Sequence, residues 1–157
     1  MSTLSDAMVS GTLAGIASAA TATLAGHAAG QAPAAALNAV SHVLWGDRAK
    51  RQDAPSGRYT LTGFVINQAA NLFWAAGYAA LRRRVPPGPA GALASGAAIA
   101  ALAYLVDYHL VPRRLTPGYE LRLQGPHLAL IYGAIALSLP LHDLLRSARR
   151  PGVTTRG

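Results

Sequence analysis

The feature that most constrains this chain is a set of four long apolar segments, at residues 8–30, 59–81, 89–111 and 126–145. Each is 20 to 23 residues long, enough for an α-helix to cross roughly 30 Å of hydrocarbon. Backbone groups in lipid must be paired internally, and the alternating ten-residue strands of a β-barrel are absent. The segments also lack the polar stripe of a soluble surface helix, which counts against a soluble helical bundle. The sequence therefore predicts an all-α fold, a bundle of four transmembrane helices.

The placement of charge supports the same prediction. Charged residues make up 13 % of the chain, about half the usual share of a soluble protein. The net charge is +8, but the arginines gather at the edges of apolar segments, as at 82–84 and 149–150. No basic patch is interleaved with aromatic residues as in proteins that stack bases. We therefore expect a lipid bilayer, and no nucleic acid, as the partner.

The first segment is expected to be broken. Gly30 and Pro33 follow one another closely, and proline cannot continue a helix without a kink. Residues 34–45 form a second apolar piece, either a kinked continuation or a half-helix folded back against the bundle. The first helix is thus broken or extended, within a single membrane domain of residues 1–148. A secretory signal peptide is not favoured because residues 1–7 contain no Lys or Arg, and residues 149–157 are predicted to be a disordered basic tail.

Orientation in the membrane is weakly determined by sequence. Four spans place both termini on one side, and each side then carries seven of the 14 Lys and Arg residues. The dense cluster at 82–84 and the acidic residues of the loops on the other side favour cytoplasmic termini. The sequence therefore predicts a multi-pass protein of the inner, or plasma, membrane of a bacterium with both termini in the cytoplasm.

Polar residues recur at helical spacing near the ends of the segments. The string NAVSHVLW at 38–45 resembles NQAANLFW at 67–74, which indicates either duplication of a two-helix unit or chance in an Ala-rich chain. Residues at i, i+4 and i+7 share one helix face, so each string forms a polar stripe. All these ends lie on the same membrane side and are expected to form one shared polar pocket. The candidate pocket residues are Asn38, His42, Asn67, Asn71, Asp107, His109 and His127.

Asp107 is the one carboxylate well inside an apolar segment. An ionisable residue exposed to lipid costs several kcal/mol, so Asp107 should face protein or water. One interpretation is a proton or cation site. The other is structural, as an ion pair with Arg113 or Arg114, or as a hydrogen bond to an asparagine or a tyrosine. The asparagines likewise either line a pocket or fasten helices together in lipid.

No motif indicates a cofactor or an enzyme. Cysteine is absent, and no His-x-x-x-His or His-Glu-x-x-His spacing occurs, so neither a metal nor another cofactor is predicted. There is no Gly-x-Ser-x-Gly elbow, no paired carboxylates and no Gly-rich phosphate loop. Two pairs of glycines four residues apart, Gly11 with Gly15 and Gly26 with Gly30, allow close contact between helices.

Three strings, NAVSHVLWGDRAKR, YTLTGFVINQAANLFWA and YLVDYHLVPRRLTPGYE, resemble a family of small uncharacterised proteobacterial inner-membrane proteins. The resemblance covers about residues 34 to 135 and implies a bacterial inner-membrane location and four helices. The family pattern often has a His near Asn67, and this chain departs from it there, which counts against a metal site. It implies no catalytic residues.

Two functional classes fit these patterns. The first is a small transport or permeation protein, able to form a homo-oligomer, whose polar pocket takes a proton, a small cation or a polar solute. The second is a non-catalytic scaffold or an accessory subunit of a larger membrane complex, in which the polar residues only fasten helices. Water access to Asp107 distinguishes them.

Overall fold

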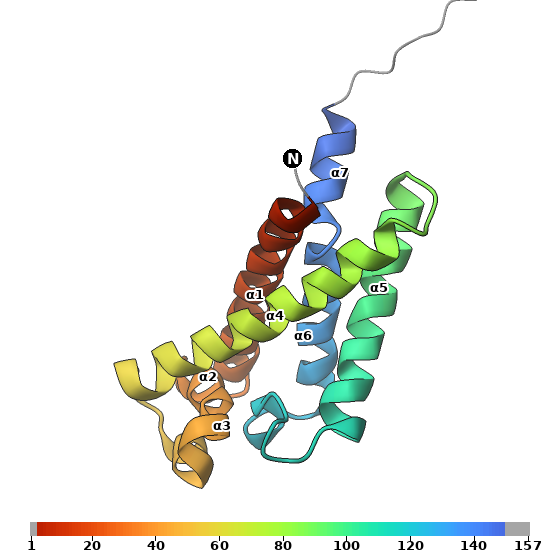
Figure 1. Ribbon diagram of the computed structural model, residues 1–157. Helices are drawn as coiled ribbons and strands as arrows, with labels where there is room; N and C mark the ends of the chain where they lie inside the picture. The colour runs from red at the N-terminus through yellow and green to blue at the C-terminus, as the bar shows by residue number, and fades with distance from the viewer. Residues whose placement is uncertain (1–2, 150–157) are drawn as a thin grey trace, which may run out of the picture.

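The computed structural model describes residues 3–149, and four long helices dominate it (Figure 1). The α-helices are α1 (Thr3–Ala28), α2 (Ala35–Val40), α3 (His42–Trp45), α4 (Thr62–Arg82), α5 (Pro89–Leu105), α6 (Gly125–Ser138) and α7 (Leu141–Ala148). Short 3-10 or π-helical turns are η1 (Gly46–Arg51), η2 (Gly57–Leu61), η3 (Val106–Leu110) and η4 (Tyr119–Leu121). No strand occurs in residues 3–149, so the predicted all-α fold is confirmed for that range.

Three helical stretches are long and apolar enough to cross a membrane. They are Leu4–Ala28 within α1, Pro89–Leu110 formed by α5 and η3, and Gly125–Ala148 formed by α6 and α7. Helix α4 has a sufficient length of 21 residues but is not one of them. Asn67, Gln68 and Asn71 lie in its sequence and lower its mean hydropathy. By length and apolar composition the fold therefore has three candidate spans. Helix α4, the fourth predicted span, is long enough but not apolar enough.

The break after the first long helix is present where it was predicted. Gly30 has a φ of 76°, and its N–H bonds to the carbonyl of His27 at 2.9 Å. The N–H of Gln31 bonds to the carbonyl of Gly26, also at 2.9 Å. This pair of bonds around a left-handed glycine is a Schellman motif, which ends α1 and satisfies its last carbonyls. Pro33 then cannot resume the same helix.

Residues 34–45 are divided, whereas the sequence predicted one helical piece. A turn at Ser41 separates α2 from α3. The Ser41 hydroxyl donates to the carbonyl of Asn38 at 2.7 Å, and the Ser41 N–H bonds to the same carbonyl at 3.1 Å. Serine side chains that bond to local backbone in this way compete with the regular helix.

Small residues set the closeness of helix packing. A Cβ atom added at Gly11 would lie 2.9 Å from the Cα of Leu72, so α1 and α4 touch backbone to backbone there. At Gly15 it would meet the end of the Gln68 side chain at 2.0 Å. The second glycine pair differs, because Gly26 has only ordinary contacts and Gly30 has open space. One of the two glycine motifs therefore makes the close contact that the sequence allowed.

Charged residues hold both ends of the described chain at one end of the bundle (Figure 1). The Arg146 guanidinium on α7 lies 2.7 Å from the Asp6 carboxylate on α1. Asp143 on α7 accepts a hydrogen bond from the Tyr78 hydroxyl of α4 at 2.9 Å and pairs with Arg82 at 3.3 Å. The described ends thus lie together, as four spans would require. The predicted disordered basic tail, residues 149–157, lies outside the described residues except for Arg149.

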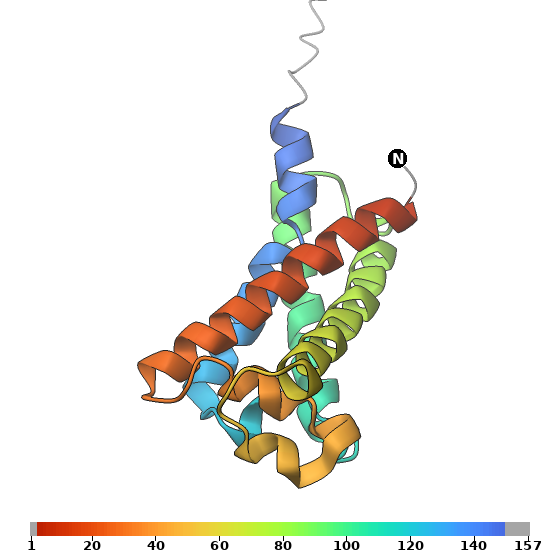
Figure 2. The ribbon, with the colours of Figure 1, turned by 90° about the vertical axis from the view of Figure 1, so that its left-hand side faces the viewer.

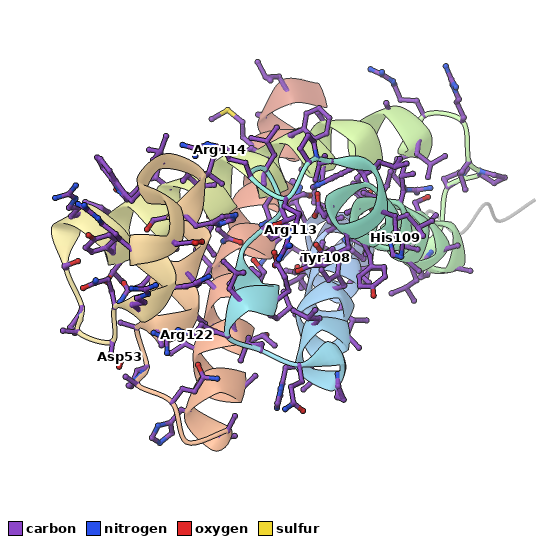
Figure 3. All side chains as sticks on the ribbon, turned by 90° about the horizontal axis from the view of Figure 1, so that it is seen from below. Asp53, Tyr108, His109, Arg113, Arg114 and Arg122 are labelled. Carbon is purple, nitrogen blue, oxygen red and sulfur yellow. The ribbon has the colours of Figure 1, made fainter. Side chains whose placement is uncertain are left out.

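The opposite end is covered by α2, α3 and the segment after them (Figure 2). The Trp45 indole N–H donates to the carbonyl of Arg58 at 2.9 Å, and the Arg58 guanidinium lies 4.5 Å from the centroid of the indole ring. Arg122 and Asp53 form an ion pair of 2.8 Å on this end (Figure 3). These contacts tie the 46–58 loop to the 112–124 connection.

Candidate functional site

Asp107 lies on a π-helical turn at the end of α5. Residues 106–110 form η3, and π-helical turns are rare in proteins and frequent at functional sites. The Asp107 Oδ2 atom accepts a hydrogen bond of 2.6 Å from the hydroxyl of Tyr132 on α6. No ion pair of Asp107 occurs within residues 3–149, so the predicted pairing with Arg113 or Arg114 is absent, whereas the alternative structural prediction, a hydrogen bond to a tyrosine, is confirmed. The carboxylate is held instead by one neutral tyrosine.

A buried hydrogen-bond network joins α1, α4 and η4. The Asn67 Oδ1 atom accepts from the Tyr119 hydroxyl at 3.0 Å and from the Ser18 hydroxyl at 3.1 Å. The Asn67 Nδ2 group donates to the carbonyl of Gly15 at 2.8 Å. Asn71 Nδ2 lies 3.2 Å from Asn67 Oδ1 and 2.9 Å from the Asn67 carbonyl. The network fastens three distant parts of the chain around one asparagine.

Burial fixes the direction of one bond in this network. Tyr119 is 3 % exposed, and burial raises the pKa of its hydroxyl above the ordinary value of 10.0. The hydroxyl is therefore protonated at neutral pH and donates to Asn67. Tyr119 follows Gly118, whose φ of 86° and ψ of −10° fit the third position of a type II turn.

A partly open cavity of about 90 Å³ lies between these groups, lined by residues of α2, α3, α4, η3, α6 and the 112–124 connection. Its polar wall consists of Asn67, Asn71, Asp107, Thr116, Tyr119 and Tyr132. We call this cavity the chamber. Asn71 is 3 % exposed, and its Oδ1 atom has no hydrogen-bond partner in the described residues. A space of this size holds a few water molecules, and a buried unpaired oxygen on its wall is an acceptor for a guest.

Three of the seven predicted pocket residues therefore line one cavity: Asn67, Asn71 and Asp107. The other four are not part of its wall. His109 is exposed, with its ring 5.8 Å from that of Tyr104, and His127 is half-buried in the first turn of α6. Seen from the end opposite the described termini, His109 lies on the α5 side, away from Asp53 and Arg122 (Figure 3).

Asn38 and His42 hold loops in place. The Asn38 side chain donates to the carbonyls of Gln52 and Ala54 at 2.9 and 3.1 Å, and accepts from the Thr60 hydroxyl at 2.6 Å. The two ring nitrogens of His42 lie 3.1 Å from the carbonyl of Ala39 and 3.2 Å from the carbonyl of Arg113. His42 thus anchors the start of the connection that covers the chamber.

Four wall or network residues had no signal of their own in the sequence: Ser18, Thr116, Tyr119 and Tyr132. Ser18 stands in an Ala-rich helix, and Tyr132 is one tyrosine in an apolar run. Helical spacing from Asp107 or Asn67 cannot find them, because each lies on a different element. No group of three His, Asp or Glu residues able to hold a metal ion occurs in the described part of the chain.

No family model, curated protein or solved structure matches this chain. The site is therefore interpreted from its own geometry.

Proposed function

We propose that the chain is an integral protein of a bacterial inner membrane with α4 as a fourth span and both described ends in the cytoplasm. Three candidate spans support the membrane location. The outward faces of the long helices carry large exposed apolar side chains: Ile16, Leu24, Phe73, Leu102, Leu130 and Leu137.

The faces of α4 support its role as a span. Its asparagines point inward, with Asn67 6 % exposed, while Val65 and Phe73 are 56 % and 68 % exposed. Asn67 and Asn71 are therefore hidden from lipid, and their side chains bond to each other, to α1 and to η4. A helix with this arrangement spans a membrane as part of a bundle, although its composition alone does not identify it.

Within that membrane domain, we propose a small transport protein that takes a proton, a small cation or a polar solute into the chamber. The observation that carries this proposal is that Asp107 and Asn71 line one cavity, and that the Asn71 Oδ1 atom has no hydrogen-bond partner in the described residues. A carboxylate at this depth is costly without a compensating positive charge, and the described residues supply only a tyrosine hydroxyl. A bound proton or cation supplies the missing charge, and Asn71 supplies a second oxygen. The proposed role requires no chemical catalysis.

A scaffold or an accessory subunit is the second candidate function. It is favoured by the way Asn38, His42 and Asn67 are used, since each makes hydrogen bonds within the chain. On this proposal the chamber holds only water, and Asp107 serves to position α6 through Tyr132. The two candidates differ in what happens when the charge of Asp107 is removed.

The test is flux through proteoliposomes containing wild type, Asp107→Asn or the control Asp53→Asn. Asn at position 107 still accepts from Tyr132 but carries no charge, whereas Asp53 lies outside the chamber in a surface ion pair. Proton entry is followed with an enclosed pH dye under an imposed potential, and small-cation entry with thallium. We expect Asp107→Asn to lose flux with unchanged helicity and thermal stability, and Asp53→Asn to retain it. Full flux in folded Asp107→Asn protein refutes the transport proposal, and absence of flux in wild type favours the scaffold.

Membrane topology is tested separately by cysteine accessibility at Ser2, Thr155 and Pro87, positions in or beyond the expected cytoplasmic regions. All three should label from the cytoplasmic side. Labelling of position 87 from the side opposite Ser2 would show that α4 does not span the membrane.

A further inference from the structure

A second cavity runs along the outside of the bundle between α5 and α6. It is an open groove of about 520 Å³, within the range of ligand sites. Its walls consist of small residues, apart from one leucine and two tyrosines. The lining residues are Ala97, Ala100, Ala101, Tyr104, Leu105, Gly125, Ala129, Tyr132, Gly133 and Ala136. No charged residue lines it. The groove faces outward on helices that are candidate membrane spans, so an occupant reaches it from the lipid phase.

The groove and the chamber share one residue. Tyr132 lines both, and its hydroxyl donates to Asp107. The inner end of the groove is therefore separated from the carboxylate by a single tyrosine side chain. A passage between the two spaces would require the Tyr132 side chain to change rotamer and give up its hydrogen bond to Asp107.

Aromatic rings surround this junction. The rings of Tyr104 and Tyr132 are 5.3 Å apart in an edge-to-face arrangement, and Tyr108 lies 5.2 Å from Tyr104 and 5.9 Å from Tyr132. The faces of such rings attract cations, most strongly where water is excluded. Beyond them lies Asp107, which has no basic partner in the described residues. Aromatic rings beside a carboxylate without a basic partner are complementary to a positive charge.

The aqueous end of the bundle has the opposite character. Arg113 and Arg114 lie on the connection that covers the chamber there, with Arg122 further along it (Figure 3). Arg122 is paired with Asp53, so the charges that repel a cation on this side are those of Arg113 and Arg114, which form no ion pair in the described residues. The uncharged groove offers a route without that repulsion, but only to a molecule with enough apolar surface to enter from the lipid phase.

From this geometry we infer that the α5–α6 groove binds an amphipathic organic cation, with its apolar body against the small residues and its charge directed past Tyr132 toward Asp107. The inference rests on the proposed transport function and names its substrate class. It is distinct from inorganic-ion or proton transport, which needs the chamber but not the groove.

The experiment measures binding of tetraphenylphosphonium to the full chain in nanodiscs, with empty nanodiscs as the lipid background. Triphenylphosphine oxide is a neutral probe of similar shape. Ala101 lines the groove and Ala98 is exposed on the same helix outside it, so Ala101→Leu and Ala98→Leu add the same bulk at matched positions. Asp107→Asn tests the charge.

We expect saturable binding of the cation to wild type, at least tenfold tighter than binding of the neutral probe. Ala101→Leu should weaken cation binding at least tenfold, and Ala98→Leu should leave it unchanged. Asp107→Asn should remove the preference for the cation over the neutral probe. These three results together support the inference.

Other outcomes overturn it. Equal binding of both probes means that the groove is only an apolar surface. A conversion from oligomer to monomer by Ala101→Leu means that the groove is occupied by a second copy of the chain. If tetraphenylphosphonium does not bind while proton or thallium flux depends on Asp107, the substrate class is wrong and the proposed function stands. If the flux is absent as well, both fail.

Discussion

The buried network around Asn67 predicts that the effect of Tyr119→Phe on stability changes sign when Asn67 is replaced by leucine. Asn67→Leu keeps the branched shape of the side chain but removes the acceptor of the Tyr119 hydroxyl, which makes no other recorded hydrogen bond. Leaving a buried hydroxyl unsatisfied costs about 1–3 kcal/mol. The lost bonds to Gly15 and Ser18 add about 0.6 kcal/mol each, the average for interhelical bonds in a membrane protein. We therefore expect Asn67→Leu to lower the free energy of unfolding by about 2–4 kcal/mol.

The second substitution decides whether this reasoning is right. In wild type, Tyr119→Phe removes one of several donors to Asn67 and should cost about 0.5–1.5 kcal/mol. In the Asn67→Leu background the same change removes the unsatisfied hydroxyl and should instead recover about 1–3 kcal/mol. Free energies come from SDS titration of the protein in detergent micelles, followed by circular dichroism, with Ala69→Leu on the exposed face of α4 as the control. An equal cost of Tyr119→Phe in both backgrounds would falsify the network as described.

Two further predictions concern glycines. A Cβ at Gly96 would lie 2.4 Å from the backbone oxygen of Ala136, so Gly96→Ala should cost about 1–3 kcal/mol, whereas Gly133→Ala meets open space and should stabilise α6 by about 0.5–1 kcal/mol. The same titrations measure both variants. Equal changes in the free energy of unfolding for Gly96→Ala and Gly133→Ala would contradict the α5–α6 packing. Gly118→Ala combines a left-handed φ with a 2.7 Å approach to the Ala39 oxygen and should cost about 2–4 kcal/mol; a cost below about 0.5 kcal/mol would contradict the turn geometry.

Much of the fold could be predicted because its determinants are local. The lengths of the apolar segments predict where three of the long helices lie, and Gly30 followed by Pro33 predicts the break after α1. The length of the fourth apolar segment predicts one helix over residues 126–145, which is wrong. In the structure α6 ends at Ser138 and α7 begins at Leu141, with the buried Pro140 between them. Proline lacks the N–H that a continuous helix needs at that position, so the signal was present in the sequence.

The candidate site was only partly predictable, because its partners come from distant elements. Helical spacing placed Asn67 and Asn71 on one face of α4, and the depth argument placed Asp107 in the same half of the bundle. Spacing along one helix contains no information about which residue of another helix lies opposite. The roles of Tyr132 and Ser18 therefore follow only from the tertiary structure, in which α6 packs against α5 and α1 packs against α4.

The two similar strings, 38–45 and 67–74, show why a polar pattern does not determine a role. In the first string, the helix is interrupted at Ser41 beside irregular loops. The Asn38 amide therefore donates to loop carbonyls that are not part of a regular helix. In the second, the asparagines lie within a 21-residue helix, and they bond to each other, to the Asn67 carbonyl, to α1 and to η4. Asn71, which lines the chamber, nevertheless keeps an Oδ1 atom without a hydrogen-bond partner in the described residues. On the transport proposal, that surplus acceptor separates the role of Asn71 from that of Asn38, because a group that only fastened helices would be satisfied by them.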